Sequence, residues 1–439
     1  MLAVRARRGF DGEQVLRDGV TVLIDDGRIV GVDERSMMVP EGCPVQEYVD
    51  ATVLPGLVDM HVHLCGDSEM GALDRLADYD DHALDGVIES GLRAQLAAGV
   101  TTVRDLGDRR WSVLEWRDRQ RAGAVGFACP TIVASGPPIT GPGGHCWSMG
   151  GEANGPSALV AAVRERAERR VDVVKIMVSG GLSTLGTDVL SCQFTLDEVR
   201  LVVEESHRLG LSVVAHAHGL PAVEQAIAAG VDGIEHCTCV TRSGIPTTDR
   251  LLESLTARQI VVCPTLGRAP DWSPPPLESQ SPQFRQARRF VETTGITPEA
   301  RQAQVGRMCI GQAYGLCLAL TPGSVHSNRT AYSPWPSATS SPAESRSRTR
   351  SHPRPHAPPS RADSVTEKVV SAQATTQTSS SSTETRSATS PHSLKPSRSS
   401  CTENTPHNPR QPTSAERQFC ASFKRRRAQQ MWAMCRGHL

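Results

Sequence analysis

The sequence predicts an α/β fold, either a (β/α)8 barrel or a doubly wound parallel sheet. Three observations support this prediction. Short apolar runs alternate with amphipathic stretches from about residue 53 to residue 320. The first 50 residues contain only short strands and tight turns, and the composition changes abruptly after Leu320. Strands that alternate with helices are typical of parallel sheets whose faces are covered by helices.

The N-terminal part is predicted to form antiparallel strands. Two apolar runs, Thr21–Ile24 and Arg28–Val32, flank the tripeptide Asp25-Asp26-Gly27. Asp-Gly pairs favour two-residue hairpin turns, because both residues tolerate a positive φ. We therefore expect residues 1–55 to form a separate small β domain.

Eight short apolar runs are predicted to be the strands of the second part. They are Leu57–Leu64, Thr101–Leu106, Thr131–Ser135, Val173–Val178, Ser212–His216, Gly233–His236, Ile260–Thr265 and Leu316–Leu320. Helices are expected between them, for example at Ala158–Arg170, Leu196–Leu209 and Leu220–Gly230. The predicted barrel domain covers residues 56–320.

The zero net charge of the 439-residue chain is a sum of two unlike parts. Residues 1–320 contain 41 acidic and 30 basic residues, whereas residues 321–439 contain 6 acidic and 17 basic ones. Ser, Thr, Pro and Arg supply 65 of the last 119 residues, and Val, Ile, Leu, Met and Phe supply 10. So little apolar surface cannot offset the entropy of the chain, so residues 321–439 are expected to be a disordered tail.

Composition also indicates the cellular compartment in which the protein is expected to function. No apolar run reaches the length that spans a bilayer, and the N-terminus lacks the apolar core of a signal peptide. The 13 cysteines are scattered, and Cys237 and Cys239 have no second pair at zinc-site spacing, so free thiols are expected. These features favour a cytoplasmic protein that binds a small-molecule substrate and neither membrane nor nucleic acid. A homo-oligomer is left open.

The sharpest motif is the pair His61 and His63 within a predicted strand. Side chains at i and i+2 of a strand point to the same face, so this pair can bind one metal ion. Lys175, His216 and His236 lie at or near the ends of three later strands. A lysine inside an apolar strand is costly unless it is paired or modified, and each histidine alone is more often structural. Three successive strands that end in this way favour a shared site.

In these motifs the chain resembles the metal-dependent amidohydrolase superfamily, and in particular the branch of imidazolonepropionase-like proteins and Xaa-Pro or Xaa-Arg dipeptidases. The resemblance spans about residues 1–320 and rests on the runs VLPGLVDMHVHL, GVTTVRDLG, GPGGHCWSMGG, DVVKIMVSGG, VVAHAHG, GVDGIEHCT and VVCPTL. It implies a TIM-like (β/α)8 barrel with a small β-sandwich built from both chain ends. It also implies two divalent metal ions, usually zinc.

The resemblance assigns roles to individual residues. His61 and His63 match the ligands of one metal ion, and His216 and His236 match those of the other. Lys175 matches a bridging lysine that CO2 carboxylates. The catalytic candidates are His145 and His216, and the substrate-binding candidates are His145, His218 and Arg104. A turn residue is the competing interpretation of His145, and a structural salt bridge is that of Arg104.

The implied activity is hydrolysis of a carbon–nitrogen bond, most simply in a dipeptide or an N-acyl amino acid, by a metal-activated hydroxide. A cyclic amide is an alternative substrate. The family's general base is an Asp at the end of the eighth strand. This chain has Leu320-Thr321-Pro322 at that place, and the first Asp after it is Asp363. An inactive remnant is therefore the competing interpretation.

The change in composition after Leu320 coincides with the position where the aspartate is missing. This suggests that residues 321–439 are the family's C-terminus read in a shifted frame. With GC-leaning third bases, Ser364–Thr385 would then encode apolar strands around a Gly-Tyr-Asp-Ala-Asp motif. A basic arm that binds nucleic acid competes, supported by Lys424–Arg427, but no interleaved aromatic residues support base stacking.

Resequencing of the gene across codons 318–326 tests the shifted frame. We expect a small insertion or deletion near Thr321-Pro322 relative to intact relatives, because the composition changes within a few residues there. A single intact frame that encodes this same tail in several isolates would contradict the hypothesis.

Overall fold

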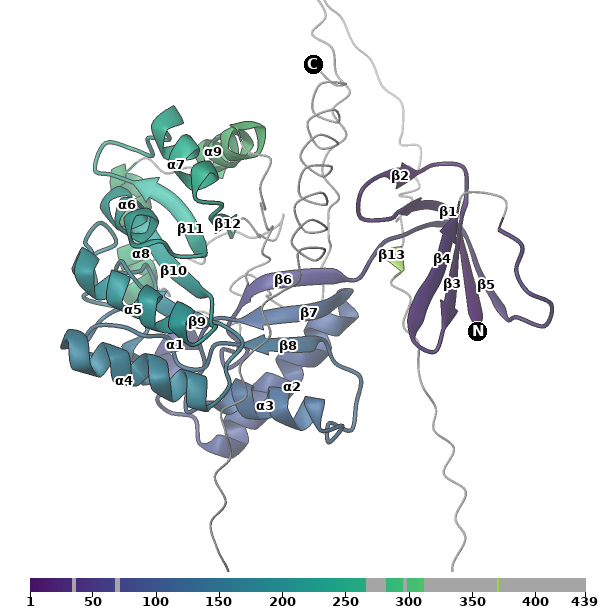
Figure 1. The fold of residues 1–439 in the computed structure, drawn as a ribbon, viewed down its shortest axis with the longest axis horizontal. Helices are drawn as coiled ribbons and strands as arrows, with labels where there is room; N and C mark the ends of the chain where they lie inside the picture. The colour runs from purple at the N-terminus through teal and green to yellow at the C-terminus, as the bar shows by residue number, and fades with distance from the viewer. Residues whose placement is uncertain (34–36, 68–71, 266–281, 295–297, 312–368, 371–439) are drawn as a thin grey trace, which may run out of the picture. The chain divides into compact units, whose positions relative to one another are not determined.

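The computed structural model describes residues 1–33, 37–67, 72–265, 282–294, 298–311 and 369–370 (Figure 1). The strands are β1 (Leu2–Phe10), β2 (Val15–Leu16), β3 (Val20–Asp25), β4 (Arg28–Asp33), β5 (Val45–Val53), β6 (Leu57–Val62), β7 (Val100–Asp105), β8 (Thr131–Ala134), β9 (Val174–Met177), β10 (Val213–Gly219), β11 (Gly233–Val240), β12 (Val261–Cys263) and β13 (Val369–Val370). The helices are α1 (Ala72–Arg75), α2 (Asp81–Ala97), α3 (Ser112–Arg121), the 3-10 helix η1 (Trp147–Met149), α4 (Gly155–Glu168), α5 (Leu196–Arg208), α6 (Leu220–Ala229), α7 (Asp249–Ala257), α8 (Pro282–Thr294) and α9 (Pro298–Gly311).

The chain divides into two compact units. One holds Met1–Gly9, Val15–Val49 and Ala372–Leu439, the last of which lies outside the described residues. The other holds Phe10–Gln14 and Asp50–Ser371. None of the described helices is both long and apolar enough to cross a bilayer. The boundaries at residues 55 and 320 stay a prediction, and the tail of residues 321–439 lies almost wholly outside the described residues.

The first unit is built on an antiparallel sheet in which β1 lies between β5 and β3, and β3 pairs with β4. The hairpin predicted from Asp25-Asp26-Gly27 is confirmed, because Asp25 of β3 pairs with Arg28 of β4. The two turn residues, Asp26 and Gly27, have φ of 46° and 71°. Positive φ at both positions is the geometry that matches the twist of the flanking strands.

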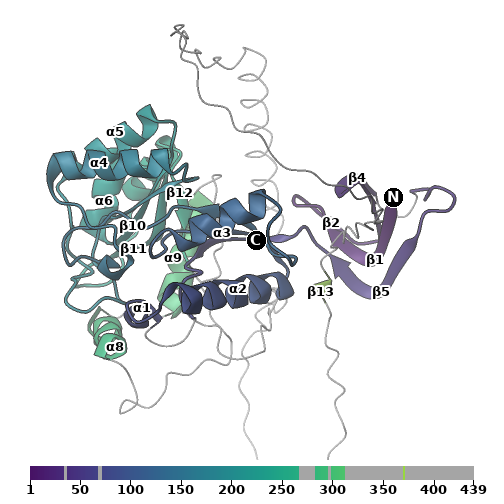
Figure 2. The same ribbon diagram turned by 90° about the horizontal axis from the view of Figure 1, so that it is seen from below.

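The second unit contains two parallel sheets, of order β6-β7-β8 and β9-β10-β11-β12. Ile139 joins them, because its N–H donates to the Lys175 carbonyl and its own carbonyl accepts from the Met177 N–H, each at 2.8 Å. Seven parallel strands therefore follow one another in chain order. In Figures 1 and 2, α2 and α3 lie along β6–β8, and α4 to α6 lie along β9–β11.

These strands confirm the predicted α/β fold with parallel sheets. Each of the first seven predicted strands overlaps an observed strand, and the three predicted helices correspond to α4, α5 and α6. The eighth predicted strand, Leu316–Leu320, would close a barrel and lies outside the described residues. Closure of the barrel therefore remains a prediction.

Along β10, residues that pack in the apolar core alternate with histidines. All of its residues are buried, as expected for a parallel strand with both faces covered. Val213, Ala215 and Ala217 belong to the apolar cluster formed with the helices. His216 and His218 alternate with them, so they point to the other face, which is the interior of the unit.

In the loop after β8, the backbone at Gly151 packs closely against that of Pro138, and a substitution at Gly151 can test this packing. A Cβ on Gly151 would lie 1.9 Å from the Pro138 carbonyl oxygen, so Gly151→Ala must displace the backbone. We expect the variant to lose about 1–3 kcal/mol of unfolding free energy, measured by urea titration. The control is Gly86→Ala in α2, where a Cβ meets nothing within 4 Å and should add about 0.5–1 kcal/mol. Equal stability of the two variants would contradict the packing.

Candidate metal centre

The first two histidines come from the end of β6. The Nδ1 of His61 lies 2.6 Å from Oε2 of Glu235, and the Nδ1 of His63 lies 2.9 Å from the carbonyl oxygen of Gly107. Both partners are acceptors, so each Nδ1 carries the proton. The Nε2 atom of each ring is then the nitrogen with a lone pair to offer a metal ion. The ring centroids are 5.3 Å apart.

Lys175 lies in the middle of β9 and has no exposed surface. Its Nζ has no hydrogen-bond partner among the described residues. Burial disfavours the charged amine and lowers the pKa of Lys175 to about 8. The interior therefore holds a reactive amine that lacks the hydrogen bonds expected of a buried polar group.

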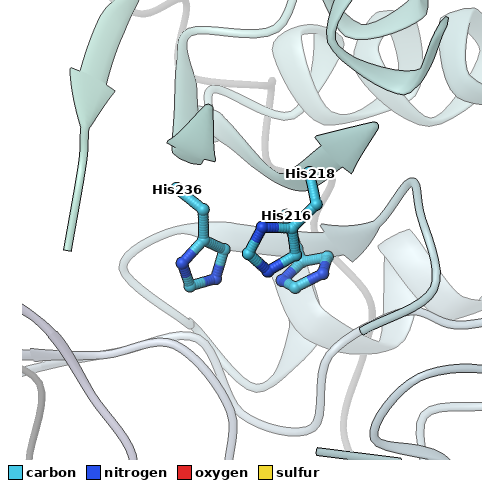
Figure 3. A group of neighbouring side chains, drawn as sticks. All are labelled: His216, His218 and His236. Carbon is cyan, nitrogen blue, oxygen red and sulfur yellow. The ribbon is translucent and has the colours of Figure 1, made fainter. Parts of the chain in front are cut away.

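Three further histidines lie together where β10 and β11 meet (Figure 3). Each of His216, His218 and His236 offers one nitrogen, and the three nitrogens lie within 4.8 Å of one another. The rings of His218 and His236 are stacked at 4.4 Å, and His216 is 4.7 Å from both. The hydroxyl groups of Thr238 and Thr265 lie 3.1 and 2.8 Å from Nδ1 of His218 and His236, and so orient those rings.

The two groups of histidines belong to one cluster. The ring of His61 lies 4.9 Å from that of His236, and the ring of His145 lies 4.4 Å from that of His216. Burial lowers the pKa of all six histidines, and neighbouring positive charge lowers it further. For His63 and His218 the pKa falls to about 3. Neutral imidazole is the form that binds metal ions.

His145 and Arg104 lie at this centre with other partners. The Nδ1 of His145 is 2.9 Å from the Thr184 hydroxyl, and its ring lies so close to Gly181 that a Cβ there would be 2.2 Å from it. Arg104 donates to Oε1 of Glu235 at 2.7 Å and to the Met60 carbonyl at 2.8 Å. This salt bridge is one of the two roles that the sequence left open for Arg104.

Two residues at the centre were not assigned a role from the sequence. Glu235 is 1% exposed and Cys263 is fully buried, and together with His61 they bring ligand atoms within 4.8 Å of one another. Glu235 carries a signal that could have identified it: a carboxylate inside an apolar strand is as costly as the amine of Lys175. Cys263 carries none, because buried free cysteine is common in cores.

The sequence and the fold are similar to those of known proteins. Residues 52–254 match the amidohydrolase family model. Ochratoxinase from Aspergillus niger is 28% identical over 215 residues, or 42% of this chain and 43% of the relative. The chain therefore spans less than half the length of this relative.

Solved structures show the same fold. A Xaa-Pro dipeptidase with methionine bound in its active site is 24% identical, with a TM-score of 0.55, and the match covers 74% of this chain and 79% of that one. The structure of A. niger ochratoxinase is 20% identical, with a TM-score of 0.56 and coverage of 73% and 76%. Residues 52–254 therefore form a domain that matches the amidohydrolase family, within a fold that these solved structures share.

Proposed function

We propose that this domain hydrolyses a carbon–nitrogen bond at a centre that holds two divalent metal ions, most simply zinc. One observation carries the proposal: His61, Lys175 and His216 are buried in the interior of the second unit, and the rings of His63 and His236 lie 5.3 and 4.9 Å from that of His61. Neutral imidazoles with fixed rings suit zinc, and hydrolases of this kind keep their metal in a shielded cavity.

The residues present fit such a group. His61 and His63 would hold one ion, and His216 and His236 the other. Lys175 would add CO2 through its neutral amine, so that an N–C bond forms, a proton leaves and an anionic carbamate replaces the unpartnered Nζ. When bound, the ions would supply a hydroxide at neutral pH and polarise the scissile carbonyl.

On the substrate side, His145 and His218 are proposed to contact the carbonyl or carboxylate. His145 is oriented by Thr184, and His218 by Thr238, so both rings are held before substrate arrives. A dipeptide or an N-acyl amino acid is the proposed substrate class, in keeping with the Xaa-Pro dipeptidase among the similar structures. We propose a cytoplasmic location, which suits the free thiols of the described cysteines.

One observation favours a second candidate, an inactive remnant. The proton acceptor expected after the eighth strand is absent, because no Asp occurs from residue 321 to residue 362. General bases typically contribute about 10²–10⁴-fold to such reactions. The chain as written could therefore retain its ligands and lack turnover.

Metal content tests the ligand set. We expect the purified full chain to contain zinc, and His61→Ala and Lys175→Ala to fall to background, as measured by plasma mass spectrometry. The matched control is His207→Ala, because His207 is half-exposed on α5 and pairs with Asp232 at 2.8 Å. Zinc at the wild-type level in both ligand variants would refute the proposed centre.

Turnover tests the missing base. If the chain as written is the inactive remnant, it should hydrolyse Xaa-Pro, Xaa-Arg and N-acyl amino acid substrates only at a very low rate. Repair of the reading frame, which would restore an Asp after the eighth strand, should raise the rate by about 10²–10⁴-fold. The assay measures release of the free amino acid. Equal rates before and after repair would overturn the account of the tail.

A further inference from the structure

Glu235 occupies an unusual place beside the metal centre. It directly precedes His236 in β11, and neighbouring residues of a strand normally point to opposite faces. Both nevertheless reach His61: the carboxylate through its 2.6 Å contact, and the His236 ring at 4.9 Å between centroids. The strand must therefore depart from its regular pleat at this point.

The backbone supplies that departure. His236, Cys237 and Cys239 all have positive φ, of 65°, 45° and 52°. The pairing between β10 and β11 shifts at the same place, because Ala217 pairs with His236 while Gly219 pairs with Val240. Two steps along β10 thus match four along β11, which is a bulge. Bulges next to active sites re-aim side chains, and here one places two consecutive residues in the same interior.

The carboxylate of Glu235 uses both oxygens. Oε2 accepts from Nδ1 of His61, and Oε1 accepts from Arg104 of β7 at 2.7 Å. Arg104 also donates to the carbonyl of Met60, the residue before His61. The side chain of Glu235 is 1% exposed, so this anion is stabilised by these donors in place of water.

Each oxygen of Glu235 therefore faces an N–H group, the Arg104 guanidinium or Nδ1 of His61, so the carboxylate acts as a hydrogen-bond acceptor on both sides.

We propose that Glu235 is a positioning residue that fixes His61 with its proton on Nδ1, so that Nε2 is directed at the metal ion. The role rests on the proposed metal centre and specifies how one of its ligands is held. Carboxylates behind metal-binding histidines fix ring orientation and raise ligand basicity, and their loss costs about 10–100-fold in metal affinity. Arg104 anchors the carboxylate and makes the same network continuous with the backbone of β6.

Zinc titration of the full chain against a chromophoric chelator tests the proposal. After metal is stripped from the protein, Glu235→Gln should bind Zn²⁺ about 10–100-fold more weakly than the wild type. The matched control is Asp59→Asn. Asp59 is equally buried on β6, but it accepts from the backbone N–H of His61 and from Gln95, so its amide variant should keep wild-type affinity. Equal zinc affinity in the Glu235→Gln variant and the wild type would overturn the role.

A second measurement needs neither metal nor a folded Glu235 variant. Nitrogen NMR of the metal-free wild type, with His61 assigned by comparison with His61→Gln, should show a proton on Nδ1. A proton on Nε2 would refute the positioning role even where Glu235→Gln fails to fold. If the wild type takes up no zinc, the proposed function fails, whereas the NMR result still decides what Glu235 does to His61.

Discussion

The fully buried amine of Lys175 constrains the chemistry that the centre of this domain can support. A buried polar group without a partner is costly, and Nζ has none among the described residues. The strand around it cannot move it to solvent, because Val174 and Ile176 are held in the apolar cluster under α4 and α5. Burial therefore favours the neutral form of this amine. The proposed conversion to a carbamate would turn the unpartnered amine into a ligand, and would so link the packing of β9 to the chemistry of the site.

The surrounding histidines are also polar groups in this interior, but they have hydrogen-bond partners. Desolvation lowers the pKa of each ring and so favours its neutral form. The hydrogen-bond partners of His61, His63 and His236 each occupy one ring nitrogen and leave the other. The acceptors come from strands other than the histidine's own or from loops, so ring orientation depends on the assembled fold. Glu235 extends this dependence across the interior, because it joins β11 to β6 and β7 through two hydrogen bonds. A single buried anion thus couples the two parallel sheets at the level of the site.

Much of this arrangement could be predicted from periodicity. The i, i+2 spacing of His61 and His63 predicted one shared face, and their ring centroids lie 5.3 Å apart. The role of Glu235 could not be predicted, because regular alternation places it opposite His236. Only the positive φ at His236 reverses that expectation, and a local strain of this kind has no signature in a single sequence. His218 lies two residues beyond His216 and shares its face, and its role toward the substrate stays a prediction, although β10 extends past both residues to Gly219.

The change in composition after Leu320 lies between the proposed metal ligands and the position where the general base is expected. Every residue proposed to bind metal precedes Gly311, where α9 ends. That helix still supports the centre: Arg301 donates to the carbonyls of His236 and Pro264, and Gln304 donates to that of Thr238. The aspartate expected after Leu316–Leu320 is absent from the sequence, whereas the contacts around the proposed ligands are made by β6 to β12 and α9. The proposed metal binding and the proposed turnover are therefore expected to be separable, because the ligands precede the change in composition and the expected aspartate would follow it.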